Sequence, residues 1–206
     1  MRRSIYIIIS AFFFYANLPI CHLHAAVPTT QADECGWKQS CTSIIVGAKA
    51  STDGSVMTSH TCDGKYRTWL SIEPSQEHSK GDLRKVYKNT MKTTCRNDST
   101  GIELTGTIPQ VKHTFAYLNT AYPCLNEKQL GIGETTWGGP DTLQNPNSVF
   151  LIEELERLAL ERCSTAKEAV LMMGRLAEKY GYADSGECLT IADPKEVWFF
   201  EIIGCG

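Results

Sequence analysis

The first apolar stretch of the chain lies close to its start. Residues 5–20 are almost wholly apolar and follow a pair of arginines. The run is short for a membrane span and contains an asparagine and a proline, so it is typical of a secretory signal peptide. We expect residues 1–25 to be this signal, with an uncleaved membrane anchor as the alternative. Residues 26–40 are polar, show no apolar period, and are predicted to be a linker or pro-segment.

A β-branched run follows and predicts a hairpin. Residues 42–48 read TSIIVGA, which is typical of a strand. The Ser-Thr-Asp-Gly sequence at 51–54 predicts a turn, since its glycine can adopt positive φ. Residues 55–60 are the expected return strand. Cys41 therefore stands at the very start of the first strand of this hairpin.

The middle of the chain has a weaker pattern. Residues 71–107 are polar and rich in Lys, Ser, Thr and Asp, so they are predicted to be loop with short strands. Two more strands are expected at residues 113–118 and 129–133, joined by a turn around residues 122–126.

Apolar residues at helical spacing then predict two adjacent helices. The first begins at Ser148 and runs to about Arg162, with leucines on one face. The second follows a capping-box pattern formed by Thr165 and Glu168, and Gly181 is placed to end it. Such stripes form a core far more often than they form a cofactor site.

A final strand pair is predicted at residues 188–192 and 197–203, around a turn at residues 193–196. The resulting order is strands, two adjacent helices, then strands. This order favours a layered α+β sandwich over alternating βαβ units.

Composition limits the classes of partner. The chain has 206 residues, 21% of them charged, and a net charge of -3, which suits a globular domain. Nucleic acid is not expected as a partner, because binding to phosphates needs a basic patch and the Lys and Arg residues are scattered. The nine cysteines could form disulfides after export, and their connectivity stays open. They contain no C-x-x-C pair, so a structural zinc site is not expected.

Cys41 is the candidate nucleophile. A thiolate is a good nucleophile and a free α-amino group is a usable base, so cleavage of the bond between residues 40 and 41 would supply both in one residue. The chemistry needs a cysteine at the first position of an anchored strand and a disposable segment before it. Residues 26–40 and Cys41 provide that arrangement.

Three ordered blocks carry a resemblance to a known family. The first is the start of the hairpin, CTSIIVG with ASTDGS after it, and the second is NEKQLGIGETT at residues 126–136. The third runs from Glu161 to Trp198 and ends in IADPKEVW. Together they resemble the dipeptidase A family, secernin-related cysteine peptidases of the N-terminal nucleophile hydrolase superfamily.

The resemblance implies a four-layer αββα sandwich, self-cleavage before Cys41, and hydrolysis of dipeptides. It implies no metal, and no other cofactor is expected. The expected signal peptide predicts a secreted or periplasmic protein without a membrane span once the signal is removed. Residues 41–206 would be the N-terminal part of the catalytic domain, so the sandwich is expected to be incomplete. A later asparagine of the superfamily's oxyanion hole would then lie outside this chain. The oligomeric state is not predicted.

The resemblance also suggests supporting residues. Asp63 fits the acid that would hold the new α-amino group. His60 stands where Arg or Lys is usual and is a candidate substrate-binding residue. Thr135 is placed to offer a backbone N–H to the oxyanion, and Glu134 could bind a substrate amine. The alternatives are a solvated turn for Asp63, a surface position for His60, and a simple strand before a glycine turn for the last two.

Two other functions remain open at this point. One is an acylase of the bile-salt hydrolase or penicillin acylase type, which shares the chemistry and differs in substrate. The other is a non-catalytic secreted domain held by disulfides, in which Cys41 would pair with Cys35 or Cys62.

Overall fold

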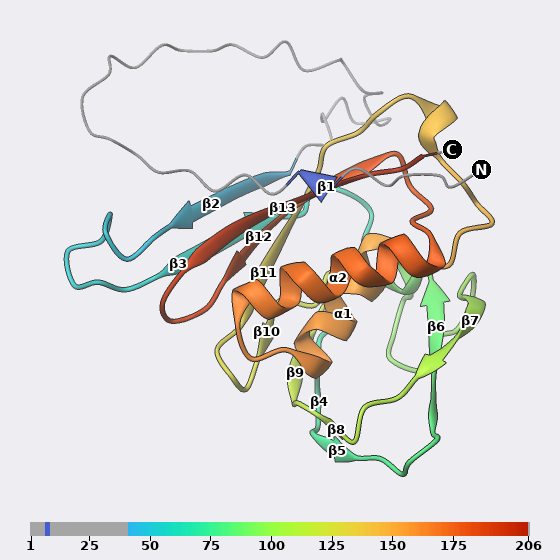
Figure 1. Ribbon diagram of the computed structural model, residues 1–206. Helices are drawn as coiled ribbons and strands as arrows, with labels where there is room; N and C mark the ends of the chain where they lie inside the picture. The colour runs from blue at the N-terminus through green and yellow to red at the C-terminus, as the bar shows by residue number, and fades with distance from the viewer. Residues whose placement is uncertain (1–6, 9–40, 206) are drawn as a thin grey trace.

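The computed structural model describes residues 7–8 and 41–205, drawn in colour in Figure 1. The expected pro-segment, residues 26–40, and all but residues 7–8 of the expected signal, residues 1–25, lie outside the described residues. In the described ranges, strands precede and follow two consecutive α-helices, so the fold is α+β as predicted. None of the helices in these ranges is long and apolar enough to span a membrane.

The largest sheet of the described part is antiparallel and has seven strands. Its spatial order is β1 (Ile7–Ile8), β13 (Val197–Ile203), β12 (Gly186–Ala192), β11 (Gly131–Thr136), β10 (Leu125–Asn126), β9 (Tyr117–Asn119) and β4 (Ser71–Glu73). The predicted final strand pair is confirmed, because β12 and β13 pair along their whole length. The strand predicted at residues 129–133 begins at Gly131, since Gln129 has a φ of 64° and closes a turn onto Asn126.

The other described strands form smaller antiparallel pairs. The predicted hairpin is confirmed as β2 (Thr42–Val46) and β3 (Met57–Thr61). The strand predicted at residues 113–118 is divided: β8 (His113–Thr114) pairs with β5 (Gln76–Glu77), whereas β9 joins the large sheet.

The prediction of loop with short strands at residues 71–107 is confirmed, but the sequence did not predict that two of these strands pair with each other. β6 (Leu83–Lys88) and β7 (Glu103–Pro109) form a hairpin of six- and seven-residue strands with an irregularity at Val86 and Tyr87. Their apolar alternation is hidden, because Lys88 is buried and donates a hydrogen bond to the carbonyl of Pro146 at 2.8 Å. Long polar side chains can occupy positions that face the protein in this way.

Two α-helices cover one side of the large sheet. α1 (Ile152–Arg162) begins four residues after the predicted Ser148, because the backbone N–H groups of Val149 and Phe150 instead donate to the end of the second helix. That helix, α2 (Ala166–Tyr180), has the predicted capping box on Thr165 and ends at Gly181 with a φ of 87°. Two 3-10 turns, η1 (Thr90–Lys92) and η2 (Asp141–Leu143), lie in the connections.

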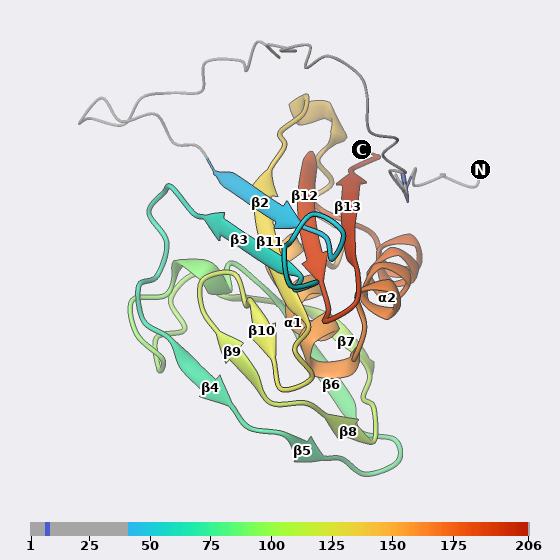
Figure 2. The same ribbon diagram turned by 90° about the vertical axis from the view of Figure 1, so that its left-hand side faces the viewer.

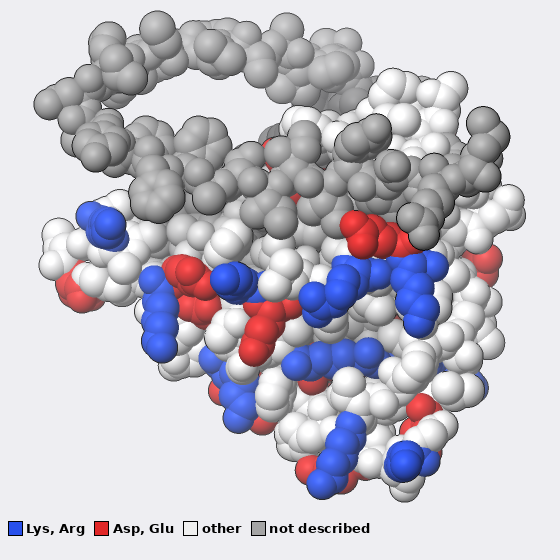
Figure 3. All heavy atoms as spheres, viewed as in Figure 1, with Lys and Arg blue, Asp and Glu red and all other residues white. Residues whose placement is uncertain are grey.

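The described elements form three successive layers. The β2–β3 hairpin lies on one face of strands β11 to β13, and α1 and α2 lie on the other (Figure 2). The core lies between the sheet and the helices, and its fully buried side chains include Ile132, Leu189, Ile191, Leu155 and Met173. Each such side chain contributes about 1.5–3 kcal/mol by leaving water. On the outside, basic and acidic side chains are interspersed over the face seen in Figure 3.

Candidate active site

Two glycines of β11 let the hairpin approach the large sheet closely. A Cβ on Gly133 would lie 2.7 Å from Thr190 Oγ1 and 3.0 Å from His60 Nδ1. A Cβ on Gly131 would lie 3.2 Å from Thr58 Cγ2. These separations leave little room for a side chain at either position, so glycine at both fixes how near β3 can come.

Polar contacts then hold the hairpin in place. The hydroxyl groups of Thr58 in β3 and Thr190 in β12 hydrogen-bond at 2.8 Å. The Ser43 hydroxyl in β2 hydrogen-bonds to that of Thr135 in β11. Ser43 therefore lies on the inner face of the hairpin, and Cys41, two residues earlier, shares this face.

The strand register places two cysteines opposite each other. Thr42 pairs with Thr61 at the end of the β2–β3 ladder. One step further along the same register, Cys41 lies opposite Cys62. Both sulfurs therefore face the end of β11 from adjacent strands.

Three donors surround the Cys41 sulfur. They are the Cys62 thiol and the backbone N–H groups of Asp63 and Thr136. The hydrogen bond from Cys62, with those from the two N–H groups, lowers the pKa of Cys41 to about 6, although burial and the charge of Glu134 oppose the shift. This shift favours the thiolate, which is the reactive form of a cysteine side chain. The pKa of Cys62 is raised, chiefly because its thiol donates to Cys41.

The strand geometry distinguishes Thr136 from Thr135. The N–H of Ile132 donates to the carbonyl of Cys124 at 2.9 Å, on the side of β11 away from β12. Alternate N–H groups of a strand point to the same side, so that of Thr136 also points away from β12 and that of Thr135 points toward it. The sequence suggested the Thr135 N–H as the oxyanion donor, and the geometry brings the Thr136 N–H to the sulfur instead.

Asp63 and His60, the two residues suggested on the second strand, lie in different surroundings. Asp63 follows β3 with an exposed side chain, and its backbone N–H reaches Cys41. His60 lies on the inner face of β3 against Gly133. Burial lowers the pKa of His60, so its ring is neutral near pH 7 and does not replace the charge of an Arg or Lys.

Glu134 belongs to a buried pair of carboxyl groups. Its side chain is fully buried and accepts a hydrogen bond from the Thr136 hydroxyl at 3.1 Å. Burial raises the pKa of Glu134, and burial with a hydrogen bond to Glu134 raises the pKa of Glu187 to about 11. The Oε2 atoms of both have no N–H or O–H partner among the described residues, so a proton shared between the two carboxyl groups would satisfy both. Sequence reasoning missed Glu187, since only the β11–β12 register brings it to Glu134.

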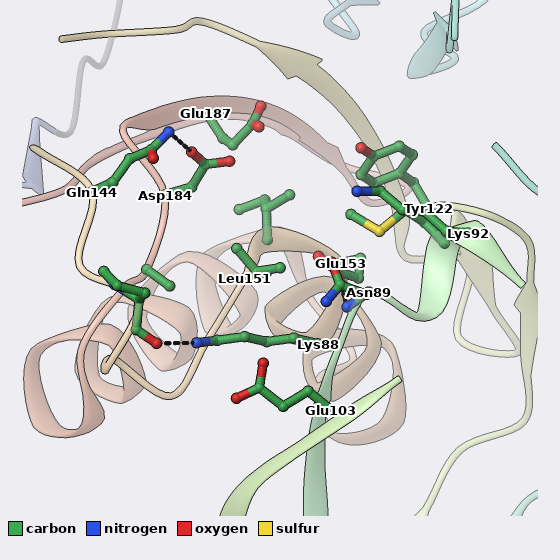
Figure 4. A pocket seen from close by; sticks show the side chains of 14 residues that line it. Lys88, Asn89, Lys92, Glu103, Tyr122, Gln144, Leu151, Glu153, Asp184 and Glu187 are labelled. Carbon is green, nitrogen blue, oxygen red and sulfur yellow. Dashed lines mark hydrogen bonds between the residues drawn. The ribbon is translucent and has the colours of Figure 1, made fainter. Parts of the chain in front are cut away.

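A cavity of about 330 Å³ lies beside this pair, between η1, the start of α1 and the segment before β12 (Figure 4). Glu187 and Tyr122 line it, together with Glu153, Asp184 and Lys88. Cys41 is not one of its lining residues. The cavity and Cys41 are separated by other residues, among them Glu134 beside Glu187 and Tyr66 beside Tyr122.

The seven cysteines of residues 41–205 are all free thiols. Within the same residues, no group of three or more His, Cys, Asp and Glu side chains is arranged to hold a metal ion. The described site places the Cys41 sulfur at a strand start, with backbone N–H donors beside it.

Comparison with known proteins adds family information. Residues 40–206 match the family model described as Peptidase family C69. The chain is 29% identical over 179 residues to a "Probable dipeptidase B" of Lactococcus lactis subsp. lactis (strain IL1403), a match that covers 81% of this chain and 35% of the relative. It is 27% identical over 182 residues to a "Probable dipeptidase A" of Streptococcus pyogenes serotype M18 (strain MGAS8232), covering 80% of this chain and 35% of the relative. The chain thus spans about a third of the length of these curated relatives. No solved structure gave a significant match.

Proposed function

The chain belongs to peptidase family C69, and we propose that it is the N-terminal part of a secreted cysteine dipeptidase with Cys41 as nucleophile. One observation carries the proposal. Cys41 stands at the start of β2, opposite Cys62 in the hairpin register, and hydrogen bonds from Cys62 and from two backbone N–H groups lower its pKa to about 6. The names of the relatives, dipeptidases A and B, point to the substrate class.

The proposed reaction begins with removal of the segment before Cys41. Cleavage of the bond between residues 40 and 41 gives Cys41 a free α-amino group, with an ordinary pKa of about 8. The Cys41 sulfur attacks the scissile carbonyl of the dipeptide, and the C–N bond breaks as the α-ammonium group protonates the leaving amine. Water, losing a proton to the same amino group, then hydrolyses the thioester and frees the sulfur.

The neighbours of Cys41 would support these steps. The N–H of Thr136, beside the Cys41 sulfur, would donate to the oxyanion, a contribution of about 3 kcal/mol in known enzymes. The carboxylate of Asp63 would orient the new α-amino group. Glu134 would receive the substrate amine, and the buried proton shared with Glu187 would be displaced when that cation binds. His60 would support the hairpin as a neutral ring.

We further propose that the three described layers belong to a four-layer αββα sandwich of the N-terminal nucleophile type. The outer face of the hairpin supports this, because Ile44 and Met57 are 61% and 49% exposed there. Such apolar positions are covered in a sandwich with a second helical layer. The expected signal, residues 1–25, and pro-segment, residues 26–40, would be removed during export to a secreted or periplasmic location.

Mass spectrometry and N-terminal sequencing of the secreted protein test the proposal. A mature chain that begins at Cys41 and cleaves dipeptides is expected, and a Cys41→Ala variant should stay unprocessed and inactive. Cys95→Ala, at an exposed cysteine, is the matched control and should be processed normally. A mature chain that keeps residues 26–40 would overturn the proposal. If it were processed but cleaved only non-peptide amides, the acylase alternative would replace it.

A further inference from the structure

We propose that Cys62 is a positioning residue of the candidate site, whose thiol donates a hydrogen bond that holds Cys41 in its thiolate form. The inference rests on the proposed function for its importance to catalysis. Its chemistry can be tested without that function.

The geometry follows from the hairpin. Residues directly opposite each other on antiparallel strands have Cβ atoms about 4.5–5.5 Å apart. Cys41 and Cys62 occupy such positions, one step beyond the Thr42 and Thr61 pair. Both face the large sheet, so the register brings the Cys62 thiol beside the Cys41 sulfur. Neither sulfur is in a disulfide.

The surroundings decide which sulfur carries the charge. The backbone N–H groups of Asp63 and Thr136 are both directed at the Cys41 sulfur, and each stabilises an anion there. Cys62 is half-buried, and the carboxyl groups of Glu134 in β11 and Glu156 in α1 disfavour a negative charge on it. These surroundings favour the negative charge on Cys41 and the remaining proton on Cys62.

Other titratable groups also face the pair. Tyr66, after β3, is close enough to Cys41 for their charges to interact, and its pKa is raised mainly by burial. Glu134 adds a negative potential at Cys41 that opposes ionisation. Neither group replaces the donor that Cys62 supplies, so removing this thiol should shift the titration of Cys41 upward.

A purely structural role for Cys62 makes a different prediction. If the side chain only filled space, alanine and serine at this position would have similar effects on Cys41. If it donates a proton, serine keeps the function and alanine loses it. Thr and Val provide a second matched pair, because they have nearly the same shape and only Thr has a donor.

Alkylation by iodoacetamide across pH 5 to 9 tests the inference, with the modified residue identified by mass spectrometry. Lys49 lies between the two cysteines, so trypsin places them on separate peptides. The rate at Cys41 should have its midpoint near pH 6 in the unsubstituted protein. Cys62→Ala should raise the midpoint by about one unit or more and lower the rate at pH 6 about fivefold. Cys62→Ser should stay within about half a unit of the original midpoint.

The control is Cys188→Ala, at a half-buried cysteine of β12, which should leave the midpoint unchanged. If Cys62→Ala fails to fold, as judged by circular dichroism, the comparison of Cys62→Thr with Cys62→Val decides the question. Equal midpoints for the donor and non-donor variants would overturn the inference. Rapid alkylation at pH 6 without dipeptide cleavage would instead contradict the proposed function and leave the inference intact.

Discussion

Replacing Gly133 with alanine should loosen the hairpin that carries Cys41. The new Cβ would lie 2.7 Å from Thr190 Oγ1 and 3.0 Å from His60 Nδ1. Thr190 can relieve the first contact by rotating, but its hydroxyl then loses hydrogen bonds to Thr58 Oγ1 at 2.8 Å and to the Gly133 carbonyl at 3.3 Å. With about 1 kcal/mol for each bond and about 1 kcal/mol for the crowding against His60, the free energy of unfolding should fall by about 3 kcal/mol.

Urea denaturation measures this change, read as a shift of the midpoint at constant slope. Gly106→Ala is the matched control, since Gly106 also lies within a strand and its Cβ would lie 3.8 Å from Val149 Cγ1, an ordinary contact. It should be neutral or stabilise the protein by up to about 1 kcal/mol. If Gly133→Ala changes the free energy by less than about 0.5 kcal/mol, the close packing of the hairpin on β11 is refuted.

Two further predictions concern the charged groups of α1. Burial raises the pKa of Glu153 to about 7, above its ordinary 4.5, so this side chain takes up a proton on folding. The stability that this proton uptake contributes is fully present below about pH 4.5 and is lost as the pH rises through 7. Glu153→Gln should remove about 3 kcal/mol from the difference in unfolding free energy between pH 5 and pH 8, and an unchanged difference would contradict it. Arg84→Met removes the cation that forms ion pairs with Glu154 and Glu161 of α1. The free energy of unfolding, measured by denaturation, should fall by about 3 kcal/mol. Arg96→Met, at an exposed ion pair, should lower the free energy of unfolding by less than about 1 kcal/mol. Equal losses for the two variants would contradict a larger contribution from the buried ion pairs.

The hairpin shows what local sequence could predict. The first expected strand ends at residue 48, and the return strand begins at residue 55. Pairing residue 48 with residue 55 gives the observed register. Cys41 opposite Cys62 therefore follows from the sequence once the ladder is extended beyond His60. The capping box of α2 is local in the same sense, because Thr165 and Glu168 satisfy each other within one turn.

The remaining features depend on distant segments. The N–H of Thr136 points away from β12 because β12 pairs along the other side of β11, and no pattern within residues 131–136 carries that information. Glu187 meets Glu134 only through the β11–β12 register. The β6–β7 hairpin escaped prediction because its buried positions include Lys88, which polarity alone places at the surface.

The burial of α1 also constrains the order in which the chain folds. Nearly every residue of this helix is buried, including Glu154 and Glu161, and both form ion pairs with Arg84 of β6. Bringing these carboxylates out of water before Arg84 arrives would cost several kcal/mol for each. Arg84 and Glu161 are 77 residues apart, so this step requires the closure of a long loop. We therefore expect the β6–β7 hairpin to dock with α1 in the transition state for folding. A chain released before α1 is complete would expose this hairpin without the helix that covers it.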